Sequence, residues 1–287
     1  MYFVPFVFKR MDIPYFDLGG TTPPLHFLHA NGYPPNCYKP LFERLQTQYH
    51  VFGMYLRPLW EGSKPDELKT WHPLSDDLLQ FLGSKTTEPV IAVGHSIGAI
   101  VTLRAALRDP KKFRALVLID PVLVVPRFMR MWQIVRWMGL ADRLHPLIHG
   151  AKKRRRTFDD LETVFRGYRS RPVFRYMSDE NLRIYIEGIT RKTDDGYELV
   201  YSPDWEAQIY RTGMQDFDIW RELPDLTVPT LFIRGAETDT FFEPAARLVK
   251  RKQPKARVEA LEKSTHILPL ERPQELFDIM QDFLKSI

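Results

Sequence analysis

The sequence of 287 residues predicts an α/β fold in which helices flank a mostly parallel central sheet. Short apolar runs alternate with amphipathic helical segments at both ends of the chain, and one apolar run leads through a glycine-rich turn into a helix. The alternation stops near residue 122 and resumes near residue 223. We therefore expect a core made of residues 1–121 and 223–287, with residues 122–222 inserted as a helical cap.

The core elements follow from apolar spacing and from the glycines and prolines between the runs. We expect strands over residues 3–8, 15–18, 25–29, 51–56, 90–93, 115–119, 230–233 and 258–261. We expect helices over residues 37–48, 74–82, 99–107, 244–252 and 271–284. The inserted segment shows mostly helical periodicity and no convincing buried strand; one helical stripe consists of Phe128, Met131, Trp132, Val135 and Met138.

Composition excludes several classes of protein. The single cysteine, Cys37, rules out an intramolecular disulfide framework, and the chain lacks a clustered Cys/His metal pattern. We expect no metal, no other cofactor and no nucleic-acid partner. No apolar stretch approaches the ~20 residues that span a membrane. The apolar N-terminus lacks a basic leader and a small-residue cleavage site, so a cytoplasmic protein is expected.

Charge is concentrated in the inserted segment. Residues 127–175 contain 13 lysines and arginines but only four acidic residues, although the net charge of the whole chain is +5. Such asymmetry indicates a module with its own partner or surface role. Residues 152–156, Lys-Lys-Arg-Arg-Arg, are interpreted either as a solvated loop or as a site of weak, salt-sensitive attraction to an anionic membrane surface or to acidic substrates.

The glycine-rich turn has the pattern Gly-x-Ser-x-Gly over residues 94–98, with Ser96 at its centre. A strand, a sharp turn and a helix form the context in which this pattern presents a nucleophilic serine. The glycines leave room for close packing of strand and helix. The backbone N–H of Ile97 is expected to point to the position of a substrate oxyanion.

Three further stretches follow predicted strands, at the sheet edge where α/β folds place their sites. With them the sequence resembles the α/β-hydrolase fold superfamily over nearly all of the core. Residues 29–34, His-Ala-Asn-Gly-Tyr-Pro, look like its oxyanion loop, and residues 94–98 look like its nucleophile elbow. Residues 234–239 resemble its acid loop, and residues 265–273 resemble its histidine loop.

The resemblance implies a catalytic triad in the chain order Ser96, Asp239, His266. His266 would remove the serine proton, and Asp239 would orient the imidazole. Asp120, which directly follows a predicted strand, and Glu237 remain alternatives for the acid.

The resemblance also implies a second donor for the oxyanion hole beside Ile97. The backbone N–H of Tyr33 takes this part, and the Asn31 side chain, which stands where the family has a histidine, is another candidate. Alternatively, Asn31 and Tyr33 only hold the turn together by hydrogen bonds.

A serine at the elbow argues against related dehalogenases and epoxide hydrolases, which use aspartate. It favours an acyl-enzyme, and hence hydrolysis of a small-molecule carboxylic ester, thioester or lactone. A C–C bond hydrolase, an acyltransferase and a non-catalytic ligand-binding member of the fold are the alternatives. We expect a hydrophobic acyl pocket under the cap, lined by Trp60, Phe128, Met131 and Trp132. The sequence predicts no oligomeric state.

Overall fold

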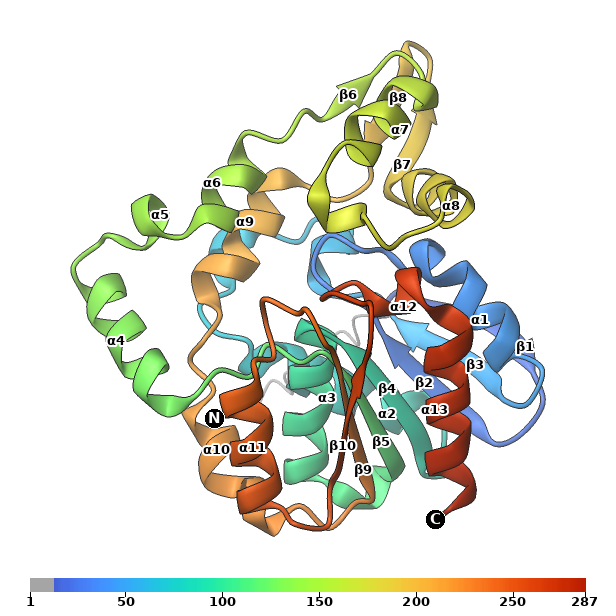
Figure 1. The fold of residues 1–287 in the computed structure, drawn as a ribbon, viewed down its shortest axis with the longest axis vertical. Helices are drawn as coiled ribbons and strands as arrows, with labels where there is room; N and C mark the ends of the chain where they lie inside the picture. The colour runs from blue at the N-terminus through green and yellow to red at the C-terminus, as the bar shows by residue number, and fades with distance from the viewer. Residues whose placement is uncertain (1–12) are drawn as a thin grey trace, which may run out of the picture.

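The computed structural model describes residues 13–287, so the strand expected over residues 3–8 lies outside them. The central sheet has seven strands in the order β1-β3-β2-β4-β5-β9-β10, and all neighbours pair in parallel except β1, which is antiparallel to β3 (Figure 1). The strands are β1 (Tyr15–Gly20), β2 (Pro24–Leu28), β3 (His50–Met54), β4 (Val90–His95), β5 (Phe113–Ile119), β9 (Thr230–Gly235) and β10 (Arg257–Leu261). The predicted α/β class and mostly parallel sheet are confirmed.

Helices cover both faces of this sheet. On one face lie α2 (His72–Lys85), α3 (Ile97–Arg108), α10 (Phe217–Glu222) and α11 (Glu243–Lys252). On the other lie α1 (Lys39–Leu45), α12 (Leu268–Glu271) and α13 (Pro273–Lys285). The expected helix over residues 37–48 is shorter, because its start is a 3₁₀ turn, η1 (Pro35–Tyr38).

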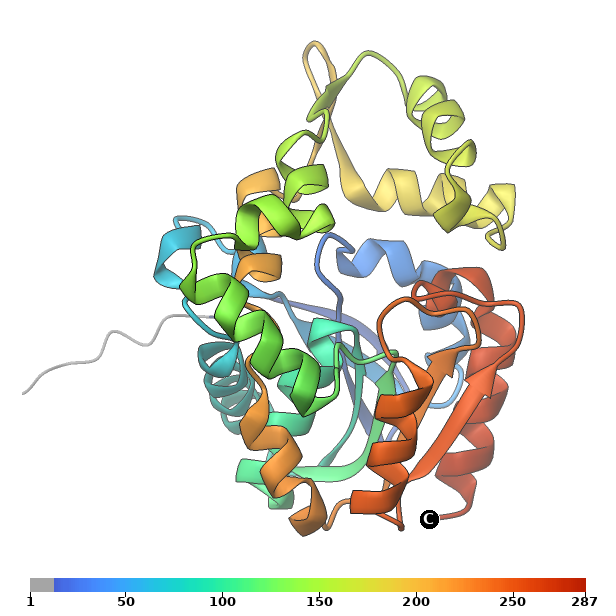
Figure 2. The ribbon, with the colours of Figure 1, turned by 60° about the vertical axis from the view of Figure 1, so that its left-hand side comes forward.

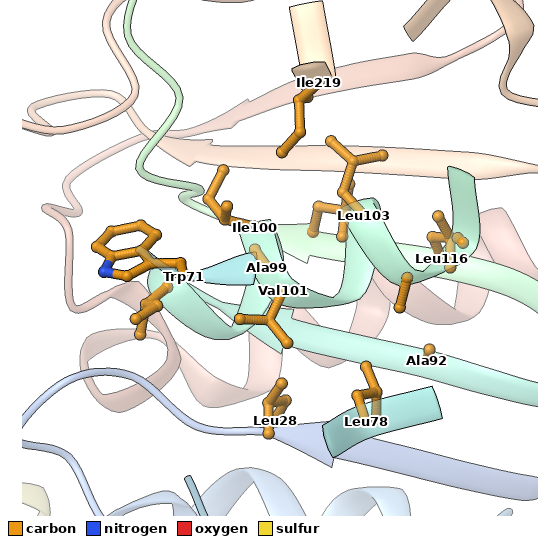
Figure 3. Packing of buried hydrophobic residues seen from close by; sticks show 14 of the residues in the cluster. Leu28, Trp71, Leu78, Ala92, Ala99, Ile100, Val101, Leu103, Leu116 and Ile219 are labelled. Carbon is orange, nitrogen blue, oxygen red and sulfur yellow. The ribbon is translucent and has the colours of Figure 1, made fainter. Parts of the chain in front are cut away.

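The two-residue period of a strand explains how one sheet supports two cores. In β4, Val90 and Ala92 join the hydrophobic cluster under α2 and α3, whereas Ile91 and Val93 join the cluster under α1 and α13. Figure 3 shows the first cluster, in which Leu28, Leu78 and Val101 meet between β2, α2 and α3. Strands buried on both faces read as continuous apolar runs, and this is why the sequence reveals them.

The strand order positions the site. From β2 the chain goes to β3 on one side, and it later returns to β4 on the other side of β2. The carboxyl ends of β2 and β4 therefore flank a point where the strand order reverses, which is where open α/β sheets bind ligands. The loop after β2 and the turn after β4 meet there.

Residues 122–222, called here the cap segment, connect β5 to β9. Most of the segment lies above the carboxyl ends of the strands, whereas α10 packs against α3 on the face of the sheet (Figures 1 and 2). Besides α10 it contains α4 (Pro126–Trp137), α5 (Ala141–Leu144), α6 (Pro146–Lys152), α7 (Leu161–Arg169), α8 (Asp179–Ile189) and α9 (Pro203–Thr212). It also contains an antiparallel sheet of order β6-β8-β7, from β6 (Thr157–Phe158), β7 (Thr190–Thr193) and β8 (Gly196–Leu199). The purely helical prediction missed these short strands, because most of their residues are not buried and show no apolar run.

Within residues 13–287, no helix combines the length and the apolar character needed to cross a membrane.

Candidate active site

Ser96 lies at the junction of β4 and α3 in a conformation that serine rarely adopts. Its φ is 58° and its ψ is −117°. A Cβ on Gly94 would lie 2.5 Å from the Gly98 carbonyl oxygen, and a Cβ on Gly98 would collide with the Leu28 carbonyl. The two glycines therefore let the turn close against β2, and the surrounding packing holds the strained serine in place.

His266 lies on the loop after β10 and contacts Ser96 directly. The distance from its Nε2 to the Ser96 Oγ is 2.9 Å. Its other ring nitrogen, Nδ1, lies 2.6 Å from Oδ2 of Asp120. Serine, imidazole and carboxylate thus stand in one hydrogen-bonded row, the arrangement in which an imidazole can take the serine proton.

The structure places Asp120, and not Asp239, beside the imidazole, so the acid expected from the sequence is wrong in position. Asp120 follows β5 directly and is fully buried. Its carboxylate also accepts hydrogen bonds from the Gly235 N–H and, at 2.5 Å, from the Thr238 hydroxyl. Asp239 is exposed and accepts a hydrogen bond from the neighbouring Thr240 hydroxyl.

The physical reason is the adjacency of β5 and β9. Because the two strands pair in parallel, their carboxyl ends deliver both acidic residues to the same sheet edge. The loop after β9 turns Thr238 inward to cap Asp120, and the next residue, Asp239, then faces solvent. Glu237, the other alternative, is exposed and pairs with Arg175 and Tyr176 of the cap segment.

The electrostatics of His266 suit a general base. Burial lowers the pKa of its imidazole, but the hydrogen bond from its Nδ1–H to Asp120 and the negative charge of Asp120 outweigh burial. Asp239 and Glu271 add smaller effects of the same sign through their charges. The pKa of His266 therefore lies above its ordinary value of 6.5.

Glu271, to which the sequence analysis assigned no role, fixes the loop that carries His266. Its carboxylate accepts hydrogen bonds from both the backbone N–H and the hydroxyl of Thr265, at 2.7 and 2.8 Å. Glu271 lies within residues 265–273, which resemble the histidine loop, but neither this resemblance nor its spacing of six residues from Thr265 assigns it this role.

His95, next to Ser96, joins three loops without touching the serine hydroxyl. Its Nε2–H donates to the His266 carbonyl at 2.8 Å, and its Nδ1 accepts from the Tyr38 hydroxyl, also at 2.8 Å. The Tyr38 oxygen in turn accepts the backbone N–H of Ala30. Burial and the nearby His266 hold the pKa of His95 well below its ordinary value, so a neutral ring makes these contacts.

The expected oxyanion donors differ in availability. Ile97 is the first residue of α3, so its N–H has no acceptor within the helix and is free to face a ligand. The Tyr33 N–H donates to the Ala30 carbonyl at 3.3 Å. The Asn31 side-chain amide donates to the backbone carbonyl of Glu206 in the cap segment, at 3.2 Å. Asn31 therefore points to the cap, contrary to the expectation of an oxyanion donor.

The residues expected to line an apolar pocket are scattered. Phe128 and Met131 lie on the exposed side of α4, because Met129 and Trp132 take its buried side, and this contradicts an enclosed acyl pocket lined by them. The Trp132 ring packs against His145 at 5.3 Å between centroids. Trp60 donates its indole N–H to the Tyr55 carbonyl.

Comparison with known proteins identifies the family of this chain. A family model described as "Alpha/beta hydrolase family" matches residues 27–279. The chain belongs to the alpha/beta hydrolase family.

Relatives of this hydrolase are distant in sequence and similar in fold. It is 22% identical to 2-(acetamidomethylene)succinate hydrolase of Mesorhizobium japonicum, over 98% of this chain and 96% of that protein. A crystal structure of E-2-(acetamidomethylene)succinate hydrolase superposes with a TM-score of 0.75 at 21% identity, over 94% of each chain. The thioesterase domain from the curacin biosynthetic pathway also gives a TM-score of 0.75, at 17% identity over 93% of this chain and 94% of that one. At these identities the structural likeness shows the fold.

Proposed function

We propose that this alpha/beta hydrolase is a serine hydrolase that cleaves carboxylic esters, thioesters or lactones through an acyl-enzyme on Ser96. The observation that carries the proposal is the continuous row from Ser96 Oγ through His266 to Asp120, with contacts of 2.9 and 2.6 Å. Such a row turns a weak hydroxyl nucleophile into an active one.

In the proposed reaction, His266 Nε2 takes the proton of Ser96 while the serine oxygen attacks the acyl carbonyl carbon. The carbonyl oxygen becomes an oxyanion that accepts hydrogen bonds from the Ile97 N–H and from the Tyr33 N–H, which exchanges its long contact with Ala30 for the oxyanion. His266 then gives the proton to the leaving oxygen or sulfur. Water, activated by the same imidazole, hydrolyses the acyl-enzyme and restores the Ser96 hydroxyl.

Asp120 acts on His266 and not on the substrate. Its carboxylate accepts the Nδ1–H, which leaves Nε2 as the basic nitrogen facing Ser96, and it stabilises the imidazolium formed during attack. Because Gly235 and Thr238 also donate to Asp120, the carboxylate is held in one orientation. This is why we assign the acid to Asp120.

The test uses a panel of aryl esters of increasing acyl length with the wild type and Ser96→Ala. We expect the variant to fold normally and to lose at least ~10³-fold in kcat/KM. Full activity in Ser96→Ala would contradict the proposed mechanism.

Acyl transfer is a second candidate on the same site. This chain is 21% identical to ethanol acetyltransferase 1 of Hanseniaspora uvarum, over 92% of this chain and 80% of that protein. Acyl transfer and ester hydrolysis can both proceed through an acyl-enzyme. Adding ethanol to the ester assay separates the two: a transferase forms the ethyl ester in preference to the free acid, and a hydrolase releases the acid.

A further inference from the structure

A cluster of tyrosines around one arginine lies between the oxyanion loop and the cap segment. We call it the tyrosine cluster; its members are Tyr33, Tyr168, Tyr185, Tyr201 and Tyr210, with Arg154 among them. The Tyr33 and Tyr185 rings lie 5.3 Å apart, and the Tyr168 and Tyr185 rings 6.0 Å apart. Tyr33 supplies its backbone N–H to the proposed oxyanion hole, but none of the side chains of the cluster has a role in the proposed chemistry, so these side chains need another explanation.

Arg154 is the inward-facing member of the basic run 152–156. Its side chain is 15% exposed, whereas its neighbours Lys153 and Arg155 are exposed. The guanidinium donates to the Tyr168 hydroxyl at 2.9 Å, to the Tyr185 hydroxyl at 3.4 Å and to the Glu206 carboxylate at 2.9 Å. The interpretation of the whole run as a solvated loop is therefore wrong at this residue.

The cluster lies directly against the oxyanion loop. Gly32 has a φ of 75°, and a Cβ there would lie 3.3 Å from the Glu206 carboxylate and 3.8 Å from Arg154 Nη1. The Asn31 amide reaches the Glu206 backbone on the same side. In the proposed reaction the acyl carbonyl oxygen binds at this loop, and the leaving group departs beside His266. A group held by the tyrosine cluster therefore belongs to the acyl part of the substrate.

Hydrogen-bond donors outnumber acceptors in this cluster. Burial raises the pKa of Tyr33, Tyr185 and Tyr201 well above the ordinary value, so each phenol keeps its proton. The oxygens of Tyr168 and Tyr185 already accept from Arg154, and among residues 13–287 neither hydroxyl donates a hydrogen bond of its own.

Two buried polar atoms in the same region also lack partners. The Tyr201 hydroxyl and the Asn31 Oδ1 have no hydrogen-bond partner among the residues that the structure describes. The carboxylate of Glu206 is a strong acceptor here, but one of its oxygens is already paired with Arg154. Buried polar groups in folded proteins are rarely left unpaired. The phenol protons of Tyr168, Tyr185 and Tyr201 therefore call for a ligand that carries acceptors, whereas the Asn31 Oδ1 would need a donor.

Charge favours an anionic ligand over a neutral one. Arg154 and Glu206 balance each other, but the surrounding segment 127–175 carries a large excess of lysine and arginine. Arg171 adds a further cation, with its guanidinium 4.6 Å from the centre of the Tyr168 ring. A carboxylate offers two oxygens that accept several hydrogen bonds, and bonds to a charged group are stronger than bonds to a neutral one.

We propose that the tyrosine cluster is a subsite for a carboxylate on the acyl part of the substrate. The preferred substrates are then monoesters or monothioesters of dicarboxylic acids, in place of the simple hydrophobic acyl esters expected from the sequence. This inference rests on the proposed function, because turnover of these substrates needs the acyl-enzyme on Ser96. The preference for a carboxylate comes from Arg154 and Tyr185.

The test compares two esters that differ in one group. Monomethyl glutarate has a carboxylate where methyl pentanoate has a methyl group, and release of acid is followed in a pH-stat. We expect the wild type to prefer monomethyl glutarate at least tenfold in kcat/KM. Arg154→Met and Tyr185→Phe should each lower this preference about tenfold, as expected for loss of hydrogen bonding to a charged group. The matched control is Arg155→Met, which removes an exposed charge of the same run and should change the preference less than twofold.

A binding experiment separates this inference from the proposed function. Calorimetry of glutarate with Ser96→Ala, in which no turnover is needed, should show binding that Ser96→Ala/Arg154→Met loses. Arg154-dependent binding without any ester hydrolysis by the wild type would uphold the subsite and overturn the acyl-enzyme. Hydrolysis of both esters with equal efficiency, together with no glutarate binding, would overturn the subsite alone.

A second observation stands apart from the first. The outer side of α4 and the short helices α5 and α6 after it expose a set of large apolar side chains: Met131, Ile134, Trp137, Met138, Leu144 and Leu147. Trp137 is 88% exposed. In Figure 1, α4 lies at the left edge of the molecule, away from the central sheet. A concentrated apolar surface of this kind marks an interaction site.

Positive charge borders the same surface. Arg127, Arg130, Arg143 and Lys153 are exposed there. Asp142 is the sole acidic residue between positions 122 and 158, and it is paired with Lys152 and Arg211. Exposed tryptophan and aliphatic side chains among arginines suit the boundary between lipid headgroups and acyl chains.

We propose that this surface docks on an anionic lipid bilayer, with α4 lying in the plane of the interface. Charge complementarity selects this occupant over a second copy of the chain, because two such surfaces would bring their arginines together.

Sedimentation with phosphatidylcholine vesicles containing about one third phosphatidylserine tests this docking. We expect wild-type binding that weakens at high salt and falls at least tenfold in Ile134→Glu/Trp137→Glu. The control, Arg183→Glu, reverses an exposed charge on α8 and should leave binding within twofold of the wild type. Equal binding by the wild type and Ile134→Glu/Trp137→Glu would overturn the proposal, as would wild-type dimers in light scattering that bind no vesicles.

Discussion

The segment made of β4 and α3 and the helix α4 both contain many apolar residues, yet the protein buries them to very different extents. All six residues of β4 and ten of the twelve residues of α3 are buried. In α4, which also has twelve residues, only Met129 and Trp132 are buried. Neighbouring elements pack around β4 and α3 on all sides, whereas one side of α4 is exposed to solvent or available to a partner.

Among residues 13–287, four residues other than glycine have a positive φ: Ser96, Asp120, Met214 and Lys263. Ser96 and Asp120 both have positive φ values, 58° and 41°, at the ends of neighbouring buried strands. Each such conformation costs about 1–3 kcal/mol and persists only when the surroundings over-determine it. The carboxyl edge of the central sheet provides that constraint, and it is the edge on which we place the chemistry.

The largest expected effect is a loss of kcat that distinguishes Asp120 from Asp239, the two aspartates at this edge of the sheet. Asp120→Asn should lower kcat on the order of 10⁴-fold, because an amide at this position stabilises the wrong imidazole tautomer. Asp239→Asn, a matched change on an exposed residue, should lower kcat less than tenfold. Steady-state kinetics with one ester measures both, and a larger loss in Asp239→Asn would return the acid to the position expected from the sequence.

The next effect concerns stability and contrasts a buried ion pair with an exposed one. Arg104 of α3 is fully buried and contacts Asp216, at 2.5 Å, and Asp218, at 2.7 Å. Arg104→Met leaves the buried Asp216 without its ion-pair partner, whereas Asp218 keeps His72, and the change should lower the free energy of unfolding by about 3–5 kcal/mol. Urea denaturation provides the measurement.

The control for Arg104→Met is Arg183→Met in the cap segment. Arg183 pairs with Glu162 on the exposed surface, so its loss should leave the denaturation midpoint nearly unchanged. Equal shifts of the denaturation midpoint in Arg104→Met and Arg183→Met would contradict the contrast between the buried ion pair of the core and the exposed ion pair of the cap segment.

The smallest expected effect is a shift in a pH profile. His266 must be neutral to accept the serine proton, and its pKa lies above 6.5, so the acid limb of kcat/KM should have its midpoint above pH 6.5. Asp239 contributes to this elevated pKa by its charge alone. Asp239→Asn should therefore move the midpoint to lower pH. A shift to higher pH would contradict the direction of this charge effect.

The fold, Ser96 and His266 could be predicted from the sequence because each depends on local features. Buried parallel strands are continuous apolar runs, and the elbow needs glycines at fixed positions around the serine. The acid could not be chosen with the same certainty, because β5 and β9 end side by side and each is followed by an aspartate. Only the inward turn of Thr238 decides between them.

The cap segment was less predictable for a related reason. The stripe of Phe128, Met131 and Trp132 was correctly interpreted as helical, but α4 has apolar side chains on both sides, so periodicity does not reveal which side is buried. Arg154 could not be distinguished from its four basic neighbours, because its burial depends on Tyr168, Tyr185 and Glu206, which come from three different helices.

Labelling with a fluorophosphonate tests the central claim most directly, since the reagent reacts with a serine only when an adjacent base activates it. Intact-mass analysis of the wild type at neutral pH should show one adduct, mapped by peptide sequencing to Ser96. Ser96→Ala should show none, and Asp120→Asn should react far more slowly than Asp239→Asn. An unlabelled wild type, or an adduct that persists in Ser96→Ala, would contradict the assignment of Ser96 as the activated nucleophile.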